Sequence, residues 1–104
     1  MPYFCKLYDQ KNKKWIIHEY KTLTACRKAC WENVMTTDAY QIPITMSRTG
    51  KTVIGIVDRL DTNGYVTYSS YGNKDYGRYV LKKNGEKCKL IDKDQNYNRR
   101  MYLE

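Results

Sequence analysis

The stretch that decides the fold is residues 44–91, which read ITMSRTGKTVIGIVDRLDTNGYVTYSSYGNKDYGRYVLKKNGEKCKLI. Short runs of β-branched and aromatic residues alternate there with glycine-containing turns, a pattern typical of strands joined by hairpins. The pattern predicts strands at 44–48, 51–58, 65–69, 78–82 and 86–91. Their connections are 49–50, 61–64, 71–77 and 84–85, and the Asn-Gly pair at 84–85 is the strongest two-residue turn signal in the chain.

Residues 53–57, VIGIV, are the most apolar of these runs, which predicts a strand near the centre of the sheet. Gly55 inside this strand indicates a bulge or a close approach by another part of the chain.

Residues before 44 predict one hairpin and one helix that cover this sheet. Alternation in 3–8, a polar loop at 9–14 and a return at 15–20 are typical of a half-buried hairpin. Thr22 or Thr24 can cap a helix that ends near Met35 or Thr36. Its apolar stripe is Leu23, Cys26, Cys30 and Val34, flanked by Ala25 and Ala29, with Arg27, Lys28 and Glu32 outside the stripe.

Residues 37–43 are expected to connect this helix to the strands, because Pro43 disfavours helix at Ile42. Residues 92–98 are a predicted loop, and 99–103 could add a short edge strand or remain frayed. The resulting fold class is α+β: an antiparallel sheet of about six strands, in β-β-α-β-β-β-β-β order, packed on one face by a single helix. A length of 104 residues predicts one domain over 1–104.

Composition favours a cytoplasmic protein with polyanionic partners. The net charge is +8, from 19 basic and 11 acidic residues. No apolar run approaches the ~20 residues that span a bilayer, and the N-terminus lacks the pattern of a secretory signal. Part of the lysine content is also what an AT-rich coding sequence produces, so solvated surface lysines are the plain alternative.

The positions of the cysteines allow a metal site as an alternative interpretation. Cys26 and Cys30 stand four apart on the expected helix and share a face, so with Cys5, Cys88 or His18 they could complete a zinc site. Their spacing differs from the usual Cys-x2-Cys, and on a core-facing stripe cysteine acts as a small hydrophobe. We therefore expect no metal and no cofactor, and the sequence leaves free thiols, disulfides and metal ligands open.

The sequence gives only weak indications of a catalytic site. His18 is the single histidine, and the paired aspartates lie in turns, where they bond the backbone. A small metal-independent RNase remains an alternative, because tyrosine and basic side chains can stabilise charge on a phosphate. Its candidate active-site residues would be Tyr76, Arg78, Tyr79, Lys82, Arg99 and Arg100.

Basic residues interleaved with tyrosines are the strongest functional signal. Residues 65–89 contain six basic and two acidic side chains together with five tyrosines, the first of which is Tyr65. Cations bind phosphates, and tyrosine rings can stack on unpaired bases. The candidate nucleic-acid-binding residues are Tyr68, Tyr71, Lys74, Tyr76, Arg78, Tyr79, Lys82, Lys83, Lys87 and Lys89, then Lys11, Lys13 and Lys14 beside Trp15, and finally Arg99 and Arg100.

These observations predict a non-enzymatic binding module that contacts nucleic acid, DNA or RNA, or a ribonucleoprotein. Small size and AT-biased composition suit an accessory protein of a phage or mobile element, including inhibitors that dock on a host nuclease or CRISPR complex. The alternative is a protein–protein module or homodimer that pairs through an exposed edge strand.

Overall fold

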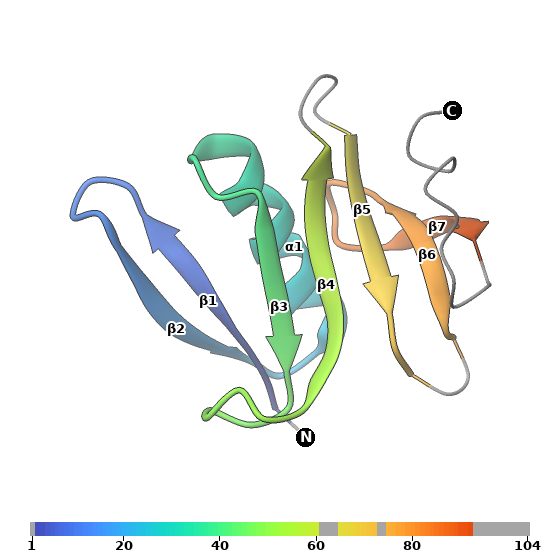
Figure 1. The fold of residues 1–104 in the computed structure, drawn as a ribbon, viewed down its shortest axis with the longest axis horizontal. Coiled ribbons are helices and arrows are strands. Elements are labelled where there is room, and N and C mark those ends of the chain that lie inside the picture. The colour runs from blue at the N-terminus through green and yellow to red at the C-terminus, as the bar shows by residue number, and fades with distance from the viewer. Residues whose placement is uncertain (1, 61–64, 73–74, 93–104) are drawn as a thin grey trace.

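The computed structural model describes residues 2–60, 65–72 and 75–92, and for residues 89–92 only the backbone. Within these ranges the chain forms seven strands and one helix: β1 Tyr3–Asp9, β2 Lys14–Tyr20, α1 Leu23–Thr36, β3 Gln41–Thr45, β4 Val53–Leu60, β5 Tyr65–Ser70, β6 Gly77–Leu81 and β7 Lys87–Asp92. All strands form one sheet in the order β2-β1-β3-β4-β5-β6-β7, and every pairing is antiparallel (Figure 1). The α+β class and the element order are confirmed, and the count of about six strands is corrected to seven.

The first hairpin extends the sheet instead of covering it. β1 pairs with β3 at Phe4↔Thr45 and Cys5↔Ile44, so β1 and β2 become the outer strands on one side. The expectation that hairpin and helix together cover the sheet was therefore wrong for the hairpin. The alternation in its sequence had already indicated a strand pair with one apolar face, and such a pair can be buried by the helix as part of the same sheet.

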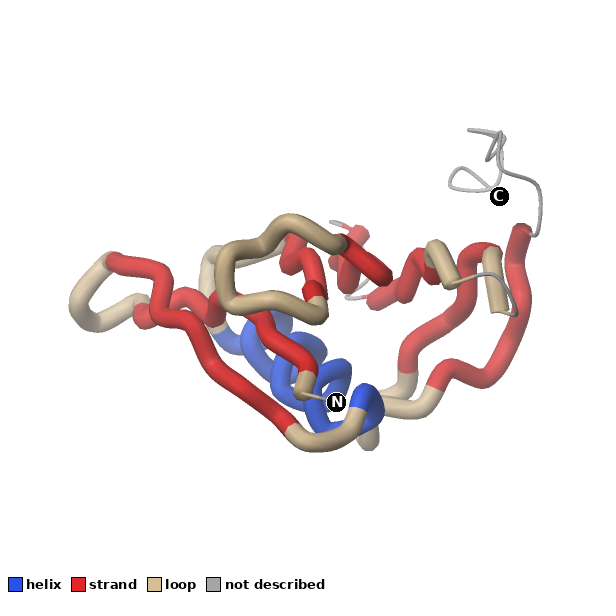
Figure 2. Tube along the Cα trace, turned by 90° about the horizontal axis from the view of Figure 1, so that it is seen from below, coloured by secondary structure: helices blue, strands red, loops and turns tan. Residues whose placement is uncertain are grey.

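The helix lies on the concave side of a curved sheet (Figure 2). Thr22, one of the two caps that the sequence offered, accepts a hydrogen bond from the Ala25 N–H at 3.1 Å, and the helix ends at Thr36, within the predicted range. Its buried stripe meets the apolar face of the central strands, and the shared core comprises Cys5, Cys26, Cys30, Val34, Ile42, Ile44, Val57, Val66, Tyr68 and Leu81. Full burial of a valine or isoleucine side chain contributes about 1.5–3 kcal/mol, so this stripe is what holds helix and sheet together.

Strand β3 begins earlier than the sequence indicated and contains Pro43. Proline is tolerated there because β1 pairs with β3 only at Ile44 and Thr45, which leaves the preceding residues of β3 unpaired on that side. The predicted two-residue turn at 49–50 is instead a wider loop over 46–52, closed by a 3.1 Å bond from the Met46 N–H to the Thr52 carbonyl.

Gly55 provides the close approach that its position indicated. It lies in β4, the central strand, where the Tyr68 ring of β5 lies so near that a Cβ on residue 55 would overlap the phenol oxygen. The glycine therefore makes room for a fully buried tyrosine.

Within the described ranges, no helix is long and apolar enough to cross a membrane.

Candidate nucleic-acid interface

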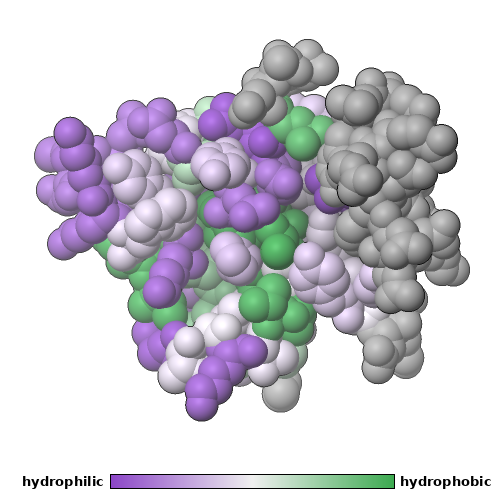
Figure 3. Space-filling view, in the orientation of Figure 1, coloured by the Kyte–Doolittle hydropathy of each residue, from purple (hydrophilic) through white to green (hydrophobic). Residues whose placement is uncertain are grey.

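The structure separates the predicted cationic residues into two groups at opposite edges of the sheet. The hairpin-tip lysines, Lys11, Lys13 and Lys14, are exposed at the β1–β2 connection. The turn lysines, Lys82 and Lys83, are exposed in the β6–β7 connection. Figure 3 shows hydrophilic side chains gathered over the β1–β2 end of the molecule. The sequence pattern named these residues as one set of candidates, and the structure places the described ones on two separate cationic surfaces.

Tyr68 and Arg78, both predicted to contact a ligand, are buried. Tyr68 is 0% exposed beneath α1, and Arg78 is 4% exposed. The Arg78 guanidinium donates to the hydroxyls of Ser69 at 3.2 Å and Thr67 at 3.1 Å and lies 3.7 Å from the Asp58 carboxylate. The expectation that these two side chains face solvent is therefore corrected, because cross-strand neighbours on β4 and β5 bind Arg78 and α1 covers Tyr68.

Tyr79 and Lys87 make contacts with each other. The Lys87 ammonium lies 4.1 Å from the centre of the Tyr79 ring and 3.8 Å from the Asp75 carboxylate, and the Tyr79 hydroxyl donates to the Asp75 carbonyl at 3.0 Å. Arg78 and Tyr79 are consecutive in β6, so their side chains leave opposite faces of the sheet. The described residues proposed for the RNase alternative therefore do not lie together in one site.

Tyr71 is exposed and Tyr76 is half-buried in the β5–β6 connection. Lys74, Arg99 and Arg100 lie outside the described residues, as does the side chain of Lys89.

The β6–β7 turn is docked on the N-terminal part of α1. Gly85 has φ +94°, and a Cβ there would overlap the Thr24 carbonyl oxygen and crowd Lys28. The Arg27 Nε donates to the Gly85 carbonyl at 2.7 Å, while its guanidinium carbon lies 5.0 Å from the centre of the Tyr68 ring. Arg27, expected on the solvent side of the helix, is thus buried by a turn almost sixty residues later, and this docking brings the turn lysines close to Lys28.

A pocket opens at the other edge, where β1 separates from β3 beyond Cys5. Its volume is about 230 Å³, and it is lined by Tyr8, Trp15, Asp38, Ala39, Tyr40 and Gln41. The Tyr8 and Trp15 rings are tilted against each other with centroids 5.1 Å apart. Trp15 is 48% and Tyr40 61% exposed, which is high for such large side chains, so solvent reaches the aromatic surfaces. We call this site the aromatic pocket.

Side-chain to backbone bonds hold the walls of the aromatic pocket. The Asn33 amide of α1 binds the Tyr8 backbone twice, accepting from its N–H at 2.9 Å and donating to its carbonyl at 3.1 Å. The Gln10 side chain accepts from the Asp38 N–H at 2.8 Å, which ties the β1–β2 connection to the α1–β3 connection. These bonds replace the strand partner that β1 lacks there, so the pocket is pre-formed.

The hairpin-tip lysines lie at this same end. Asp9 is engaged within the turn, where the Asn12 side chain and backbone N–H donate to its carboxylate at 2.7 and 3.3 Å, and these bonds lower the pKa of Asp9. In the part of the chain that is described, the hairpin-tip lysines form no ion pair. Their ammonium groups remain available for an external anion.

Sequence patterns pointed to Trp15 and the lysines next to it but missed Tyr8 and Tyr40. Tyr40 lies in an expected connection and Tyr8 in an expected strand, and only the separation of β1 from β3 brings them together.

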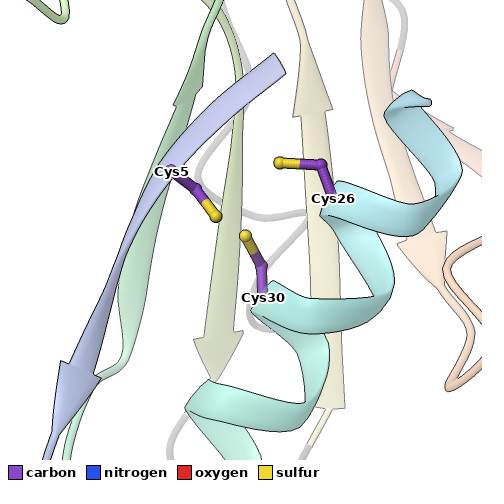
Figure 4. Close-up of side chains that lie close together, drawn as sticks. All are labelled: Cys5, Cys26 and Cys30. Carbon is purple, nitrogen blue, oxygen red and sulfur yellow. The ribbon is translucent and has the colours of Figure 1, made fainter. Parts of the chain in front are cut away.

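A second cluster lies inside the core. The sulfur atoms of Cys5, Cys26 and Cys30 are all within 4.8 Å of one another, and the three side chains point toward a common centre between β1 and α1 (Figure 4). The neighbouring Cys26 and Cys30 thiols lower the pKa of Cys5 to about 4, while the contacts of Cys30 with Cys26 and Cys5, together with burial, raise the pKa of Cys30. Cys88 is exposed on β7 and takes no part. Of the sets considered from the sequence, the structure gathers the two helix cysteines with Cys5.

Comparison of the chain with models of protein families, with curated proteins and with solved structures finds no match in any of the three.

Proposed function

We propose that the protein is a non-enzymatic module that binds single-stranded nucleic acid, free or within a ribonucleoprotein, at the β1–β2 end. One observation carries this proposal: an open pocket walled by Tyr8, Trp15 and Tyr40 lies at the same end of the sheet as the three hairpin-tip lysines. Aromatic surfaces next to unpaired cations are the combination that binds unpaired bases and their phosphates.

The pocket suits a flat ring system. Its volume of about 230 Å³ lies below the ~300–1,000 Å³ of sites for drug-sized ligands. Stacking of one base on an aromatic side chain contributes about 1–3 kcal/mol and does not require a particular base. Asp38 and Gln41 add polar atoms to the lining, which can accept or donate at a base edge.

The β6–β7 end offers a weaker site of the same kind. The turn lysines and Lys28 form a cationic surface, but the nearby Tyr79 ring is occupied by Lys87 at 4.1 Å. We assign this surface an auxiliary contact with phosphate. A nuclease or CRISPR complex that exposes a single strand would be a partner of the proposed class. Binding to such a partner would suit an accessory protein of a phage or mobile element.

The test is a binding titration with a fluorescently labelled single-stranded oligonucleotide, as DNA and as RNA, at low salt. Trp15→Ala should weaken binding about tenfold, the equivalent of losing one stacked base. Trp15→Phe keeps an aromatic ring and should stay within about threefold of the wild type. The triple variant Lys11→Glu, Lys13→Glu, Lys14→Glu should lose most of the affinity, and Lys82→Glu with Lys83→Glu should lose less.

Absence of binding at low salt, or equal losses from Trp15→Ala and Trp15→Phe, would refute the proposal. The cleavage state of the labelled RNA, read on the same samples, tests the RNase alternative.

A second candidate is supported by the edge strand β2. Among the described strands it is the last on its side of the sheet, it is seven residues long, and it exposes Trp15 and Ile16. Unprotected edges of this kind pair with a second copy or with a partner's sheet. Sedimentation of nuclease-treated protein tests this: a dimer that Ile16→Lys abolishes supports edge pairing, and a monomer at all concentrations removes the homodimer.

A further inference from the structure

The three buried cysteines are brought together by two elements that are distant in sequence. Cys5 faces the helix because it pairs with Ile44, whose side chain belongs to the same core. Cys26 and Cys30 stand one helical turn apart on α1 and point to the same side. Their exposed fractions are 3%, 0% and 0% for Cys5, Cys26 and Cys30, so the cluster is closed to solvent.

We propose that Cys5, Cys26 and Cys30 form a three-thiolate site for one soft, thiophilic metal ion, of which Cu(I) is the type. Three sulfurs bound ~2.3 Å from one ion lie roughly 4 Å apart, estimated from the length of a typical metal–thiolate bond. The sulfurs of the cluster are already within 4.8 Å of one another, so small side-chain rotations complete the site. A disulfide would need two of them to approach to about 2 Å and would leave the third without a role.

The donor set selects the class of ion. All three atoms are sulfur, and thiolates favour soft ions such as Cu(I), whereas hard ions such as Mg²⁺ and Ca²⁺ prefer oxygen. Structural zinc takes four ligands. Among the described residues no fourth donor joins the cluster, and His18, the cross-strand partner of Cys5, is exposed and lies outside it. Three-coordination is therefore what the chain supplies.

The charge of the loaded site is partly offset within the core. Each thiol that binds the ion releases one proton to solvent, so Cu(I) and three thiols give a complex of charge −2 and three protons. Arg27 follows Cys26 on α1 and is buried, so it places one positive charge on the element that carries two of the three sulfurs. Metal binding would cross-link α1 to β1 in the centre of the core.

The experiment uses the full chain, reduced and free of metal, under anaerobic conditions. Cd(II) alone and Cu(I) alone are titrated in separate arms, and the ultraviolet thiolate-to-metal charge-transfer absorption is followed. We expect saturation at one ion per chain. Loss of even an outer-shell partner costs about 10–100-fold in metal affinity, so Cys5→Ser, Cys26→Ser and Cys30→Ser should each cost more than about 100-fold. Cys88→Ser and His18→Ala should leave the affinity unchanged.

X-ray absorption of the loaded wild type counts the ligands without any substitution, which keeps the test valid if a serine variant fails to fold. Three sulfur neighbours at one distance support the proposal. Absence of binding, two sulfur neighbours, loss of the signal in Cys88→Ser, or a weakened site in His18→Ala would overturn it. If the three cysteines only pack as small hydrophobic side chains, no metal binding should be observed.

Discussion

The two lysine-bearing hairpins at opposite edges of the sheet look alike in sequence and differ in structure. The β1–β2 connection keeps Lys11 and Lys13 away from the core, and the two strands that it joins supply Tyr8 and Trp15 to the open aromatic pocket. The β6–β7 turn is pressed onto α1, where Gly85 contacts Thr24 and its carbonyl accepts from the buried Arg27. The β1–β2 hairpin is therefore open to solvent at its tip, and the β6–β7 turn covers part of the core.

This difference shows that lysines near a turn do not by themselves mark a binding surface. What separates the two hairpins is the set of distant residues that each one meets: Tyr40 at one edge, Arg27 and Tyr68 at the other. We therefore expect substitutions at the β6–β7 turn to change stability, and substitutions at the β1–β2 tip to change binding.

The largest expected effect on stability comes from Gly85→Ala, compared with Gly50→Ala. Both glycines have positive φ, which costs an alanine roughly 1–2 kcal/mol. At residue 50 no described residue lies within 4 Å of the added carbon, so only the cost of the positive φ applies. At residue 85 the carbon meets the Thr24 backbone, so the loss should exceed about 3 kcal/mol. Urea unfolding of the two variants measures both, and similar losses would mean that the turn is not docked.

Arg27→Ala should lower the free energy of unfolding by about 2–4 kcal/mol. The change removes a hydrogen bond from a charged donor to the Gly85 carbonyl and the contact with the Tyr68 ring, and it leaves a buried carbonyl unpaired. The neighbouring exposed Lys28→Ala should change it by less than about 0.5 kcal/mol. Chemical denaturation compares the two, and a loss at Arg27 no larger than that at Lys28 would show that Arg27 does not hold the turn.

Tyr68→Phe should remove a loss of stability that the wild type shows in alkali. Burial raises the pKa of Tyr68 to about 12, from the ordinary 10. Between pH 10 and 12 the unfolded chain releases this proton and the folded chain keeps it, so stability falls as pH rises through that window, by about 2–3 kcal/mol. At neutral pH the variant should be no less stable, because the phenol oxygen has no hydrogen-bond partner among the described residues.

Thermal or urea unfolding across pH 8–12 checks the prediction for Tyr68, with Tyr71→Phe, at an exposed position, as the matched control. An unchanged alkaline loss in Tyr68→Phe would contradict it.

The smallest effect on stability is expected at the hairpin-tip lysines. The triple glutamate variant should unfold within about 0.5 kcal/mol of the wild type, as exposed substitutions usually do. A melting curve measures this, and a larger loss would mean that the tip contributes to the fold and that its binding data need another explanation.

Much of the fold could be predicted because it depends on local patterns. The buried stripe through Cys26, Cys30 and Val34 and the central place of β4 follow from periodicity. Thr22 as the cap and the close approach at Gly55 were each one of two outcomes that the sequence allowed. The strand count, the place of the first hairpin and the start of β3 did not follow, because they depend on which strands pair across long stretches of chain.

The candidate site was less predictable for the same reason. Alternation cannot tell which face of β5 and β6 is covered, so Tyr68 and Arg78 could not be recognised as buried. The aromatic pocket exists because β1 and β3 separate beyond Cys5, and the thiol cluster exists because β1 passes beside α1. Neither contact can be predicted from the spacing of the residues involved.

The most direct test of the account is the salt dependence of single-strand affinity in three proteins: the wild type, the hairpin-tip triple glutamate variant, and Lys82→Glu with Lys83→Glu. Three phosphate contacts predict that log K falls with log salt at a slope of roughly −2 for a single strand. We predict that the tip variant loses most of this slope and that the turn variant keeps most of it. A slope that survives the tip substitutions and disappears with the turn substitutions would contradict the account.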